Sequence, residues 1–469
     1  MFPNIPKGTR DFSSIEMRKR NFLIQTIRKQ FELFGFVSIE TPSIENISTL
    51  IGKYGEEGDS LIFKLLHSGD FLKNRILNFL KKINHDEKTD EKTVIKYITE
   101  YMSNKALRYD LTVPFVRYVV MHKNKIVFPF KRYQIQPVWR ADKPQKGRWR
   151  EFYQCDADMI SFSWSLWEEI ELIQLCDEIF TKLNFPIVIY INHRDILVGL
   201  FEMAGIENNL WNDFTISLDK WNKIGRNLVK KEMLDKGISS LSFDKVACFF
   251  DMTENFCNKK KHLTIALQNS EKGKKGIRDL SFIYKNINNI SLQKTKLEWN
   301  LSLARGMNYY TGTIFEIVPL NNRSFISIGG GGRYDKLANL FGMNNIYGVG
   351  ISLGLDRIYL AMEQENLFQT ISSSPLKVLF IHFGNEEVLY AYKIIKFFRK
   401  EGISAQLYPN AEKIRKQFRY ANDNNIPFVI SIGKNEINQN KIKMKDLQKK
   451  TEKEYDNIDE VMNQLTKKL

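Results

Sequence analysis

The sequence predicts an α+β protein with three parts: an antiparallel sheet flanked by helices, an inserted helical module, and a C-terminal α/β domain. Three observations support this prediction. Extended segments follow one another between residues 130 and 156 without a helix between them, as in antiparallel pairing. Residues 205–291 lose strand signals and keep helical patches. After a Ser-rich linker, strands alternate with helices, which is typical of a largely parallel sheet.

Length and composition narrow the class of protein. The chain has 469 residues, 43% hydrophobic and 26% charged, so it is too long for one core and too apolar to be disordered. Its 70 Lys and Arg against 54 Asp and Glu give a net charge of +16, which favours an anionic partner or reflects a Lys-rich compositional bias. We expect a cytoplasmic protein with reduced thiols and no membrane contact. The start has no apolar leader, no apolar run approaches ~18 residues, and the four cysteines lack C-x-x-C spacing.

The first half of the chain begins with a helix expected at residues 14–34, where apolar residues recur at spacings of three and four and Gly35 suits the C-terminal cap. A short strand at residues 36–40 ends before a proline. Residues 68–103 are rich in Lys, Asn and Asp, which indicates a surface insertion. The other elements expected before the helical module are strands at 130–135, 138–140, 151–156 and 187–191 and a helix at 167–180.

In the second half, strand character returns after the helical module. The elements expected there are strands at 297–303, 313–318, 325–328 and 347–352 and helices from Tyr334 and over 354–365. In the C-terminal domain we expect strands at 377–382, 403–408 and 426–432 and helices at 387–400 and 412–422. The predicted domains are therefore 1–204 and 292–368 for the two halves of the first part, 205–291 for the inserted module, 369–375 for the linker, and 376–469.

Basic residues gather around a predicted hairpin that has a polar loop, ADKPQKGRW, between its strands. They are Lys131, Arg132, Arg140, Lys143, Lys146, Arg148 and Arg150, and Tyr133, Trp139, Trp149, Phe152 and Tyr153 lie among them. Guanidinium groups bind phosphate bidentately and aromatic rings stack on bases, so the pattern favours a polyphosphate or nucleic-acid ligand. A solvated basic face is the alternative.

The segment LARGMNYYTG places Arg305 beside a glycine, which lets the backbone approach a ligand closely. On a regular strand Tyr309 would share the face of Arg305, but a bulge at Gly306 would turn Tyr310 toward it instead. The sequence leaves both possibilities open, beside a third one in which the segment is a structural turn with core tyrosines.

Two glycine-rich segments follow. Gly329–Gly332 precede the helix expected from Tyr334, and such strand-to-helix junctions can bind phosphate, although the Lys-Ser/Thr of a P-loop is missing. GVGISLG, at residues 348–354, departs by one position from a dinucleotide-binding fingerprint. Arg357, early in the next helix, could reach into a cleft or form a surface ion pair.

Acidic and polar residues alternate in two segments. Asp110 and Thr112 are expected on one strand face, and Gln154, Asp156 and Asp158 on another, where they could enclose an amine or face solvent. No nucleophile–base pair is recognisable, and the six histidines are scattered. Several arginines without a nucleophile indicate that stabilisation of phosphate charge is the main catalytic device.

Together these motifs resemble those of the class II histidyl-tRNA synthetases. FKRYQIQPVWRADKPQKGRWREFYQCDAD resembles the second class II motif, LARGMNYYTGTIFE the signature of the histidyl enzymes, and GVGISLGLDRI the third class II motif. PKGTRDF, ETPSIE, LRYDLTVPFVRY and GGGGRYD match as well, and KIRKQFRYAND resembles the anticodon-binding module. The resemblance implies the class II antiparallel sheet flanked by helices, an inserted helical domain and a C-terminal α/β anticodon-binding domain.

The resemblance also implies the reaction. L-histidine would be activated with ATP to histidyl-adenylate and diphosphate, and then passed to the 3′ end of tRNA(His). A histidine carboxylate is already ionised at neutral pH, so activation needs alignment and charge neutralisation rather than a general base. The implied partners are L-histidine, ATP, tRNA(His) and a second copy of the chain in a homodimer.

Site residues follow from motif position in this resemblance. Arg140 and Arg305 would be catalytic, on opposite sides of the α-phosphate. The ATP-binding residues would be Arg140, Arg148, Phe152 and Arg357. The histidine-binding residues would be Asp110, Thr112, Gln154, Asp158, Arg305, Tyr309, Tyr310 and Tyr334. Lys143, Gln145 and Lys146 would approach the tRNA acceptor stem, and Mg²⁺ would bind the phosphates with Glu316 as a ligand.

Two features depart from the family pattern: Asn308 stands where many relatives have Asp, and residues 68–103 exceed the usual length. Two other functions stay open. A regulatory paralogue would bind histidine without charging tRNA, but such proteins usually lack the signature arginine and the last domain. A nucleotide-dependent dehydrogenase would need an acidic residue about twenty positions after its glycines.

Overall fold

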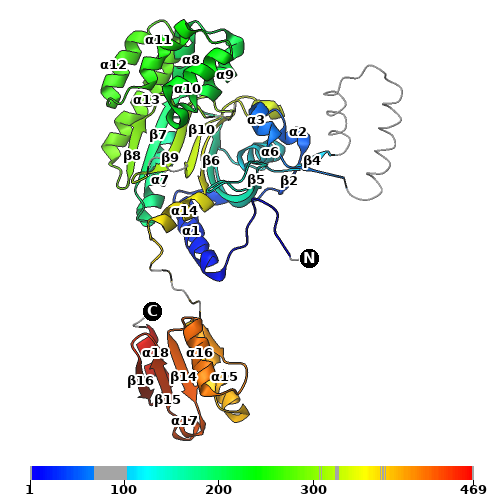
Figure 1. Cartoon of the computed structure of the whole chain (residues 1–469), viewed down its shortest axis with the longest axis vertical. Helices are drawn as coiled ribbons and strands as arrows, with labels where there is room; N and C mark the ends of the chain where they lie inside the picture. Colours follow the sequence, from blue (N-terminus) through cyan, green and yellow to red (C-terminus); the bar gives the residue numbers. More distant parts are fainter. Residues whose placement is uncertain are drawn as a thin grey trace, which may run out of the picture. The chain divides into compact units, whose positions relative to one another are not determined.

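The computed structural model describes residues 3–67, 103–305, 307, 309–322, 327–369, 371, 374 and 376–466. Contacts divide the chain into two compact units, one up to Leu367 without residues 12–18, the other formed by 12–18 and the chain from Phe368 onward. The surface insertion expected at 68–103, apart from Ser103, lies outside the described residues, and so does Asn308. Figure 1 shows the elements of both units.

The first unit is built on an eight-stranded sheet of order β1-β5-β6-β11-β10-β9-β7-β8. Its strands are β1 (Val37–Ser38), β5 (Phe130–Trp139), β6 (Glu151–Ser161), β7 (Ile187–His193), β8 (Thr295–Trp299), β9 (Thr313–Pro319), β10 (Gly329–Arg333) and β11 (Tyr347–Gly354). The inner pairs are antiparallel, whereas the edge pairs β1–β5 and β7–β8 are parallel. The predicted antiparallel sheet is thus confirmed, and the two short strands expected at 130–140 form the single strand β5.

Helices and a small sheet surround this large sheet. The helices are α1 (Ser14–Leu33), α2 (Ile47–Leu50), α3 (Gly55–Ser60), α6 (Thr112–His122), α7 (Trp167–Lys182), α8 (Arg194–Ala204) and α14 (Leu355–Gln364), with a 3-10 turn η2 (Ala338–Phe341). The small sheet pairs β2 (Ile44–Asn46), β4 (Lys105–Leu107) and β3 (Lys64–Leu65) in that order. A buried ion pair between Arg20 and Asp356 holds α1 against α14, and the two helices lie side by side in Figure 1.

The chain between α8 and β8 is helical. It contains η1 (Asn208–Leu210), α9 (Trp211–Leu218), α10 (Trp221–Asp235), α11 (Ser240–Phe250), α12 (Phe256–Ala266) and α13 (Glu271–Ile290). Glycines allow α8 and α13 to approach closely, because a Cβ on Gly199 would lie 3.0 Å from the Cα of Gly273. Buried Lys259 on α12 donates from Nζ to the backbone oxygen of Trp299 at 2.7 Å, which ties the helices to β8.

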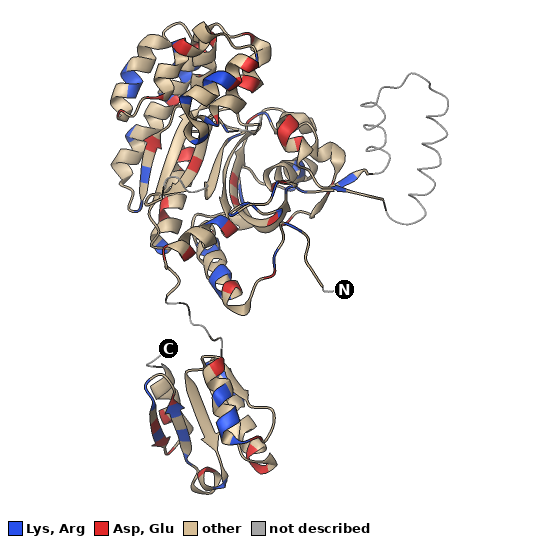
Figure 2. Ribbon diagram, in the orientation of Figure 1, with Lys and Arg blue, Asp and Glu red and all other residues tan. Residues whose placement is uncertain are grey.

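The second unit alternates strands and helices, as predicted. Its elements are β12 (Val378–His382), α15 (Asn385–Lys400), β13 (Ala405–Leu407), α16 (Ile414–Asp423), β14 (Phe428–Ile432), α17 (Lys434–Gln439), β15 (Ile442–Asp446), β16 (Thr451–Tyr455) and α18 (Ile458–Thr466). The first three strands are parallel, and the hairpin β15–β16, which we did not predict, extends the sheet with antiparallel pairs. Figure 2 shows charged residues of both signs along the ribbon of this outer hairpin, and charges on an edge strand disfavour further pairing.

Two predictions around the glycine run were wrong. Gly329–Gly332 are not a strand-to-helix junction, because they form the strand β10 itself, paired on both sides. Tyr334 starts a turn, and the next helical element is only η2. The strand expected at 297–303 is shorter than predicted and ends at Trp299. The strand expected at 325–328 falls partly outside the described residues.

The predicted strand through Asp110 and Thr112 was also wrong. β4 ends at Leu107, and Thr112 is the first residue of α6. The Asp110 carboxylate accepts a hydrogen bond from the backbone N–H of Val113 at 3.1 Å, and such a bond satisfies a free donor at a helix start. Pro114 fits the first turn, where no N–H is needed. None of the helices in the described part of the chain is both long and apolar enough to cross a membrane.

Candidate active site

A cavity of about 1500 Å³ opens over the sheet of the first unit. The walls come from β6, β9, β10, β11, the loop after β5, the start of α14 and the α11–α12 turn of the helical segment. The predicted site residues among those that line it are Asp110, Thr112, Arg140, Gln145, Arg148, Phe152, Gln154, Asp158, Arg305, Tyr309, Tyr310, Glu316, Tyr334 and Arg357. Lys143 and Lys146 are exposed and do not line the cavity. Segments that are far apart in the sequence thus meet at one place.

Arginine side chains in the cavity are held by backbone carbonyls. Arg140 donates from Nε to the oxygen of Tyr109 at 3.1 Å, and its guanidinium lies 4.2 Å from the Tyr109 ring and 5.2 Å from the Phe152 ring. Arg305 donates to the oxygen of Phe315 at 3.2 Å. Because neutral carbonyls hold these guanidinium groups, most of each positive charge stays available to a ligand.

Arg357 is fixed in the same way and shows how close the charges are. It donates to the oxygens of Gly147 and Ser327 at 3.0 and 2.8 Å. Burial lowers the pKa of Arg357 to about 10, and repulsion by Arg140 and Arg148 adds to this shift. Repelling cations that share a partly buried cavity favour an anionic ligand with several charges, such as a polyphosphate.

Asp356, the residue before Arg357, anchors the start of α14. Its carboxylate accepts hydrogen bonds from Arg10 at 2.6 Å and from the backbone N–H of Tyr153 at 2.9 Å, and it also binds Arg20. These three partners come from the N-terminal segment, α1 and β6, so they fix the direction in which Arg357 enters the cavity. Of the two possibilities considered for Arg357, the structure shows the first, since Arg357 lines the cavity and the buried ion pair at this helix start belongs to Asp356 and Arg20.

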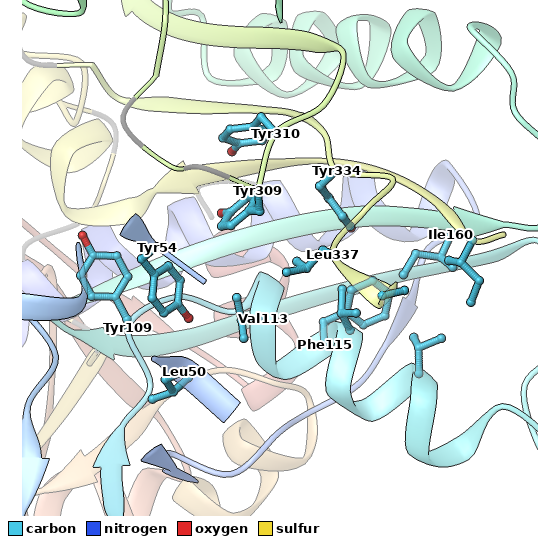
Figure 3. Packing of buried hydrophobic residues seen from close by; sticks show 14 of the residues in the cluster. Leu50, Tyr54, Tyr109, Val113, Phe115, Ile160, Tyr309, Tyr310, Tyr334 and Leu337 are labelled. Atoms are coloured by element: carbon cyan, nitrogen blue, oxygen red, sulfur yellow. The ribbon is translucent and has the colours of Figure 1, made fainter. Parts of the chain in front are cut away.

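Acidic residues and tyrosines form a niche beside the arginines. The Asp110 carboxylate is buried and accepts hydrogen bonds from the hydroxyls of Tyr54 and Tyr309, at 2.9 and 3.1 Å. The Asp158 carboxylate accepts one from the hydroxyl of Tyr334 at 2.6 Å. Tyr54, Tyr309 and Tyr334 belong to a buried apolar cluster, in which Figure 3 shows them. Such a niche can hold a small cationic or hydrogen-bonding ligand.

The orientation of Tyr309 and Tyr310, which the sequence left open, has a simple answer. Neither tyrosine lies on a strand, and both line the cavity. Tyr310 is the one beside Arg305, whose guanidinium lies 5.8 Å from its ring, whereas Tyr309 reaches Asp110. Arg305 itself has a φ of 57°, in the left-handed region, and lies six residues beyond the end of β8, so the regular strand assumed in the sequence-based alternatives does not reach it.

Glycines of β10 and β11 form the floor of this part of the cavity. A Cβ on Gly330 would overlap the guanidinium of Arg305, and a Cβ on Gly350 would overlap the carboxylate of Asp158. A Cβ on Gly332 would lie 2.9 Å from the Tyr310 ring. The glycine segments therefore do not bind a ligand through a helix terminus. Their role is to let functional side chains lie flat against the sheet.

Sequence reasoning missed the role of Arg132, which we counted with the basic loop. Arg132 is fully buried, lies opposite Asp158 in the β5–β6 register, and binds its carboxylate at 2.7 Å. Polar residues at 132, 134 and 136 alternate along β5, and this alternation was a signal for a buried polar face. Tyr54 was missed as well, because nothing in its local sequence marks it.

Asp156 lies between Gln154 and Asp158 on β6, with both carboxylate oxygens buried and with the Ser352 hydroxyl as a neighbour that can hydrogen-bond to it. Burial raises the pKa of Asp156 to about 8, Arg132 opposes this rise, and Asp158 adds to it. Across the strand pair, Gln134 has a buried Oε1 without a donor among the described residues. A protonated carboxyl could donate a hydrogen bond, and the raised pKa favours this form of Asp156.

We expect the substitution Asp156→Asn to change the pH dependence of stability. An acid with a raised pKa binds its proton more tightly in the folded state, so its contribution to the free energy of unfolding falls as the pH rises from about 4 to about 8. The free energy of unfolding of Asp156→Asn should therefore increase by at least about 1 kcal/mol, relative to that of the natural chain, as the pH is raised from 5 to 9. Urea unfolding followed by tryptophan fluorescence measures this in the first unit, which holds all seven tryptophans: Trp139, Trp149, Trp164, Trp167, Trp211, Trp221 and Trp299. A constant difference across this pH range would show that Asp156 is ionised.

Glu316 extends from β9 into the cavity wall, directly opposite Gly330 in the strand register. Within the described ranges, no group of three His, Cys, Asp or Glu side chains could hold a metal ion by itself. One carboxylate in a cavity rich in arginines fits Mg²⁺ only if the ligand brings its own oxygens, as phosphates do.

Comparisons with known proteins agree with this geometry. The family model described as Histidyl-tRNA synthetase matches residues 70–358, and the model described as Anticodon binding domain matches residues 377–468. The chain is 52% identical to the Histidine–tRNA ligase of Christiangramia forsetii, over 94% of this chain and 95% of that one. It is 50% identical to the Histidine–tRNA ligase of Flavobacterium johnsoniae, over 95% of both chains.

Solved structures give the same result for the fold. The crystal structure of histidyl-tRNA synthetase from Nostoc sp. PCC 7120 covers 100% of both chains with a TM-score of 0.81 at 27% identity. A protein from Bacillus halodurans C, described as an ATP phosphoribosyltransferase regulatory subunit/histidyl-tRNA synthetase, covers 89% of this chain and 96% of its own, with a TM-score of 0.68 at 18% identity. At that identity the second likeness concerns the fold alone.

Proposed function

Because this chain belongs to the histidyl-tRNA synthetase family, we propose that the cavity described above is the place where it activates histidine. The chain is a ligase that uses ATP to join histidine to tRNA. The observation that carries the proposal is the convergence of Arg140, Arg305 and Arg357 on one cavity, beside a niche of buried carboxylates and tyrosines.

The first step is a displacement at phosphorus. A carboxylate oxygen of histidine attacks the α-phosphorus of ATP, a new P–O bond forms, the bond to the β-phosphate oxygen breaks, and diphosphate leaves. The attacking group is already an anion at neutral pH, so no side chain has to remove a proton. What the reaction needs from the protein is in-line placement and cations around the phosphoryl oxygens.

The arginines suit these needs. Arg140 and Arg305 would bind the α-phosphate from two sides, and Arg148 and Arg357 would bind the outer phosphates. Phe152, which lies beside Arg140, would stack on the adenine. Arg148 is the most exposed of this group, with 45% of its side chain accessible, so it has the freedom to follow the leaving diphosphate.

The niche suits histidine. Asp110, Thr112 and Gln154 would bind the α-amino group, and Asp158 and Tyr310 would bind the imidazole, with Tyr309 and Tyr334 closing the pocket. Partners at both ring nitrogens would reject side chains of similar shape by about 10⁴-fold, because such side chains leave buried polar groups unpaired. Mg²⁺ would be held by the ATP phosphates with Glu316 as the protein ligand, and it would neutralise charge on the phosphates.

In the second step the 3′-terminal hydroxyl of tRNA(His) attacks the carbonyl carbon of the adenylate, and AMP leaves. The loop with Lys143, Gln145 and Lys146 would approach the acceptor stem: its two lysines are exposed, while Gln145 lines the cavity. Residues 376–469 would bind the anticodon, in agreement with the family model that matches them. The remaining parts of the chain would be the two catalytic segments, 1–204 and 292–368, and the inserted helical domain, 205–291.

We also propose a homodimer formed through the β1 edge of the large sheet. Large apolar side chains stay exposed around this edge: Leu33, Val37, Met121, Val127 and Phe162. The strand register brings the segments of Val37 and Phe162 to neighbouring strands at this side of the sheet, because Val37 pairs with Arg132 and Phe130 pairs with Ile160, two residues before Phe162. An apolar patch of this kind is typical of a subunit interface. Sedimentation equilibrium that gives a monomer at micromolar concentration would contradict the dimer.

Aminoacylation of total tRNA tests the function directly. The purified chain should attach labelled histidine to tRNA in the presence of ATP, and other amino acids should not be attached. A chain that exchanges diphosphate with histidine but charges no tRNA would instead be the regulatory paralogue considered above. The dehydrogenase alternative is ruled out by the family and by the glycine run, which forms an antiparallel strand rather than a β-α-β turn.

A further inference from the structure

Tyr54 is a buried tyrosine at the edge of the histidine niche to which the proposed function gives no role. It lies between α2 and α3 and is only 1% exposed. Its hydroxyl donates a hydrogen bond to Oδ1 of Asp110 at 2.9 Å, while the hydroxyl of Tyr309 donates to Oδ2 at 3.1 Å. Each carboxylate oxygen therefore has its own tyrosine donor.

The Tyr54 ring is held firmly in this position. Its centroid lies 4.6 Å from that of Tyr109 and 6.4 Å from that of Tyr309, and Figure 3 shows the three rings near one another in the buried cluster. On the other side it contacts α3 at Gly58, where a Cβ would lie 2.5 Å from the Tyr54 Cβ. A residue other than glycine would push the ring away, so Gly58 helps to set the direction of the hydroxyl.

We propose that Tyr54 is a positioning residue for the α-ammonium group of histidine, and that it acts through Asp110 by fixing the orientation of the carboxylate and keeping it ionised. The inference rests on the proposed function, in which Asp110 binds that ammonium. A buried carboxylate without donors protonates or rotates, and a neutral or misaligned carboxyl attracts an ammonium group weakly.

The charges around Asp110 support this role. Burial raises the pKa of Asp110, and the hydrogen bonds from Val113 and Tyr54, the charge of Arg140 and the hydrogen bond from Tyr309 oppose the rise. On β6, Asp156 and Asp158 are further carboxylates that repel a negative charge at Asp110. The remaining titratable groups that face it are Tyr109 and Tyr310. Loss of the Tyr54 hydroxyl removes one of few donors and should raise the pKa of Asp110 further.

The test measures the inhibition constants of two inhibitors of histidine-dependent ATP–diphosphate exchange. Both are measured for the natural full-length chain and for the full-length variant Tyr54→Phe. Histidinol keeps the ammonium and the imidazole, whereas 3-(imidazol-4-yl)propionate keeps the imidazole and the carboxylate but lacks the ammonium. Because Tyr54→Phe removes a hydrogen bond to a charged group, it should raise the inhibition constant of histidinol about tenfold. The inhibition constant of 3-(imidazol-4-yl)propionate should change by less than about twofold. Equal weakening of both inhibitors would mean that Tyr54 only supports packing, and it would overturn the proposal.

Tyr133→Phe is a matched control. Tyr133 is also buried and also donates to a carboxylate, Glu32, at 2.8 Å, but it does not line the cavity. The ratio of the inhibition constants of histidinol and 3-(imidazol-4-yl)propionate should stay the same in this variant as in the natural chain. A change as large as that in Tyr54→Phe would show that any lost buried hydroxyl has the same effect, and it would count against the proposal.

Asp110→Asn separates this inference from the proposed function. If Asp110→Asn does not weaken histidinol relative to imidazolepropionate, Asp110 does not bind the ammonium and the proposed role of Asp110 fails. If Asp110→Asn weakens histidinol but Tyr54→Phe does not, only the inference about Tyr54 fails. In Tyr54→Phe the acid limb of kcat/KM for histidine should also move to higher pH than in the natural chain, because the carboxylate is lost as the pH falls through a higher pKa. An acid limb at the natural pH would contradict the role in ionisation.

Discussion

Replacing Arg305 with alanine is expected to lower kcat for histidine-dependent ATP–diphosphate exchange by about 10³-fold, because one cation that faces the phosphoryl oxygens is removed. The Arg305 side chain is half-buried, and its guanidinium is held by the Phe315 carbonyl, so the positive charge has a fixed place in the cavity wall. The KM for ATP should change much less, since Arg148 and Arg357 still bind the outer phosphates. Exchange kinetics with varied ATP and histidine measure both quantities.

The substitution is clean at the level of the backbone. Arg305 has a φ of 57°, a conformation that disfavours every residue with a Cβ, so alanine has about the same backbone cost as arginine. Arg194→Ala is a suitable control, because the Arg194 guanidinium also lies over an aromatic ring, that of Trp211 at 5.4 Å, but does not line the cavity. Exchange at the natural rate in Arg305→Ala would remove the proposed mechanism.

Replacing Arg132 with methionine is expected to reduce the free energy of unfolding of the first unit by about 3–5 kcal/mol at pH 8. Arg132 and Asp158 form an ion pair in which the side chains are 0% and 3% exposed, and Asp156 lies two residues away on the same strand. Without the guanidinium, two buried carboxyl groups would have no cation. Tryptophan fluorescence during urea unfolding measures the loss in this unit.

The loss should be smaller at pH 5 than at pH 8. Asp156 and Asp158 both have raised pKa values because they are buried, and without Arg132 these values rise further, so protonation relieves most of the cost at low pH. Arg148→Met is the control: Arg148 pairs with Asp142 at 3.5 Å and its side chain is 45% exposed, so the expected change is below about 1 kcal/mol. A similar loss of unfolding free energy in both variants would mean that the buried pair stabilises the unit no more than an exposed pair does.

Elements with a strong local pattern were predicted well from the sequence. The alternation of Gln154, Asp156 and Asp158 lies on the long strand β6, as expected, and the first helix ends at Leu33, one residue before the predicted end. The arginine positions came from motifs, and the structure brings Arg140, Arg305 and Arg357 to one cavity. What these residues do in the reaction stays a proposal until the substitutions are made.

Other features depended on contacts between distant segments. Arg132 reads as part of a basic loop, and only the register of β5 with β6 reveals that it faces Asp158. Asp110 and Thr112 were assigned to a strand because polar residues alternate there, but the chain instead turns at Asp110 and starts α6 at Thr112. The local sequence of the glycine run suggests a phosphate-binding junction. Its actual role is not visible there, because the side chains that pack against these glycines come from distant segments of the chain.

The glycines under Arg305 and Asp158 limit how the pocket could be redesigned. Enlarging a binding pocket usually means trimming side chains, but Gly330 and Gly350 have none to trim. An engineered chain that accepts ring-expanded histidine analogues must therefore gain its volume sideways, by shortening tyrosines such as Tyr310 or Tyr334, and each shortening removes a hydroxyl from the niche. Room for a bulkier substrate and discrimination against ordinary amino acids are thus opposed in this architecture.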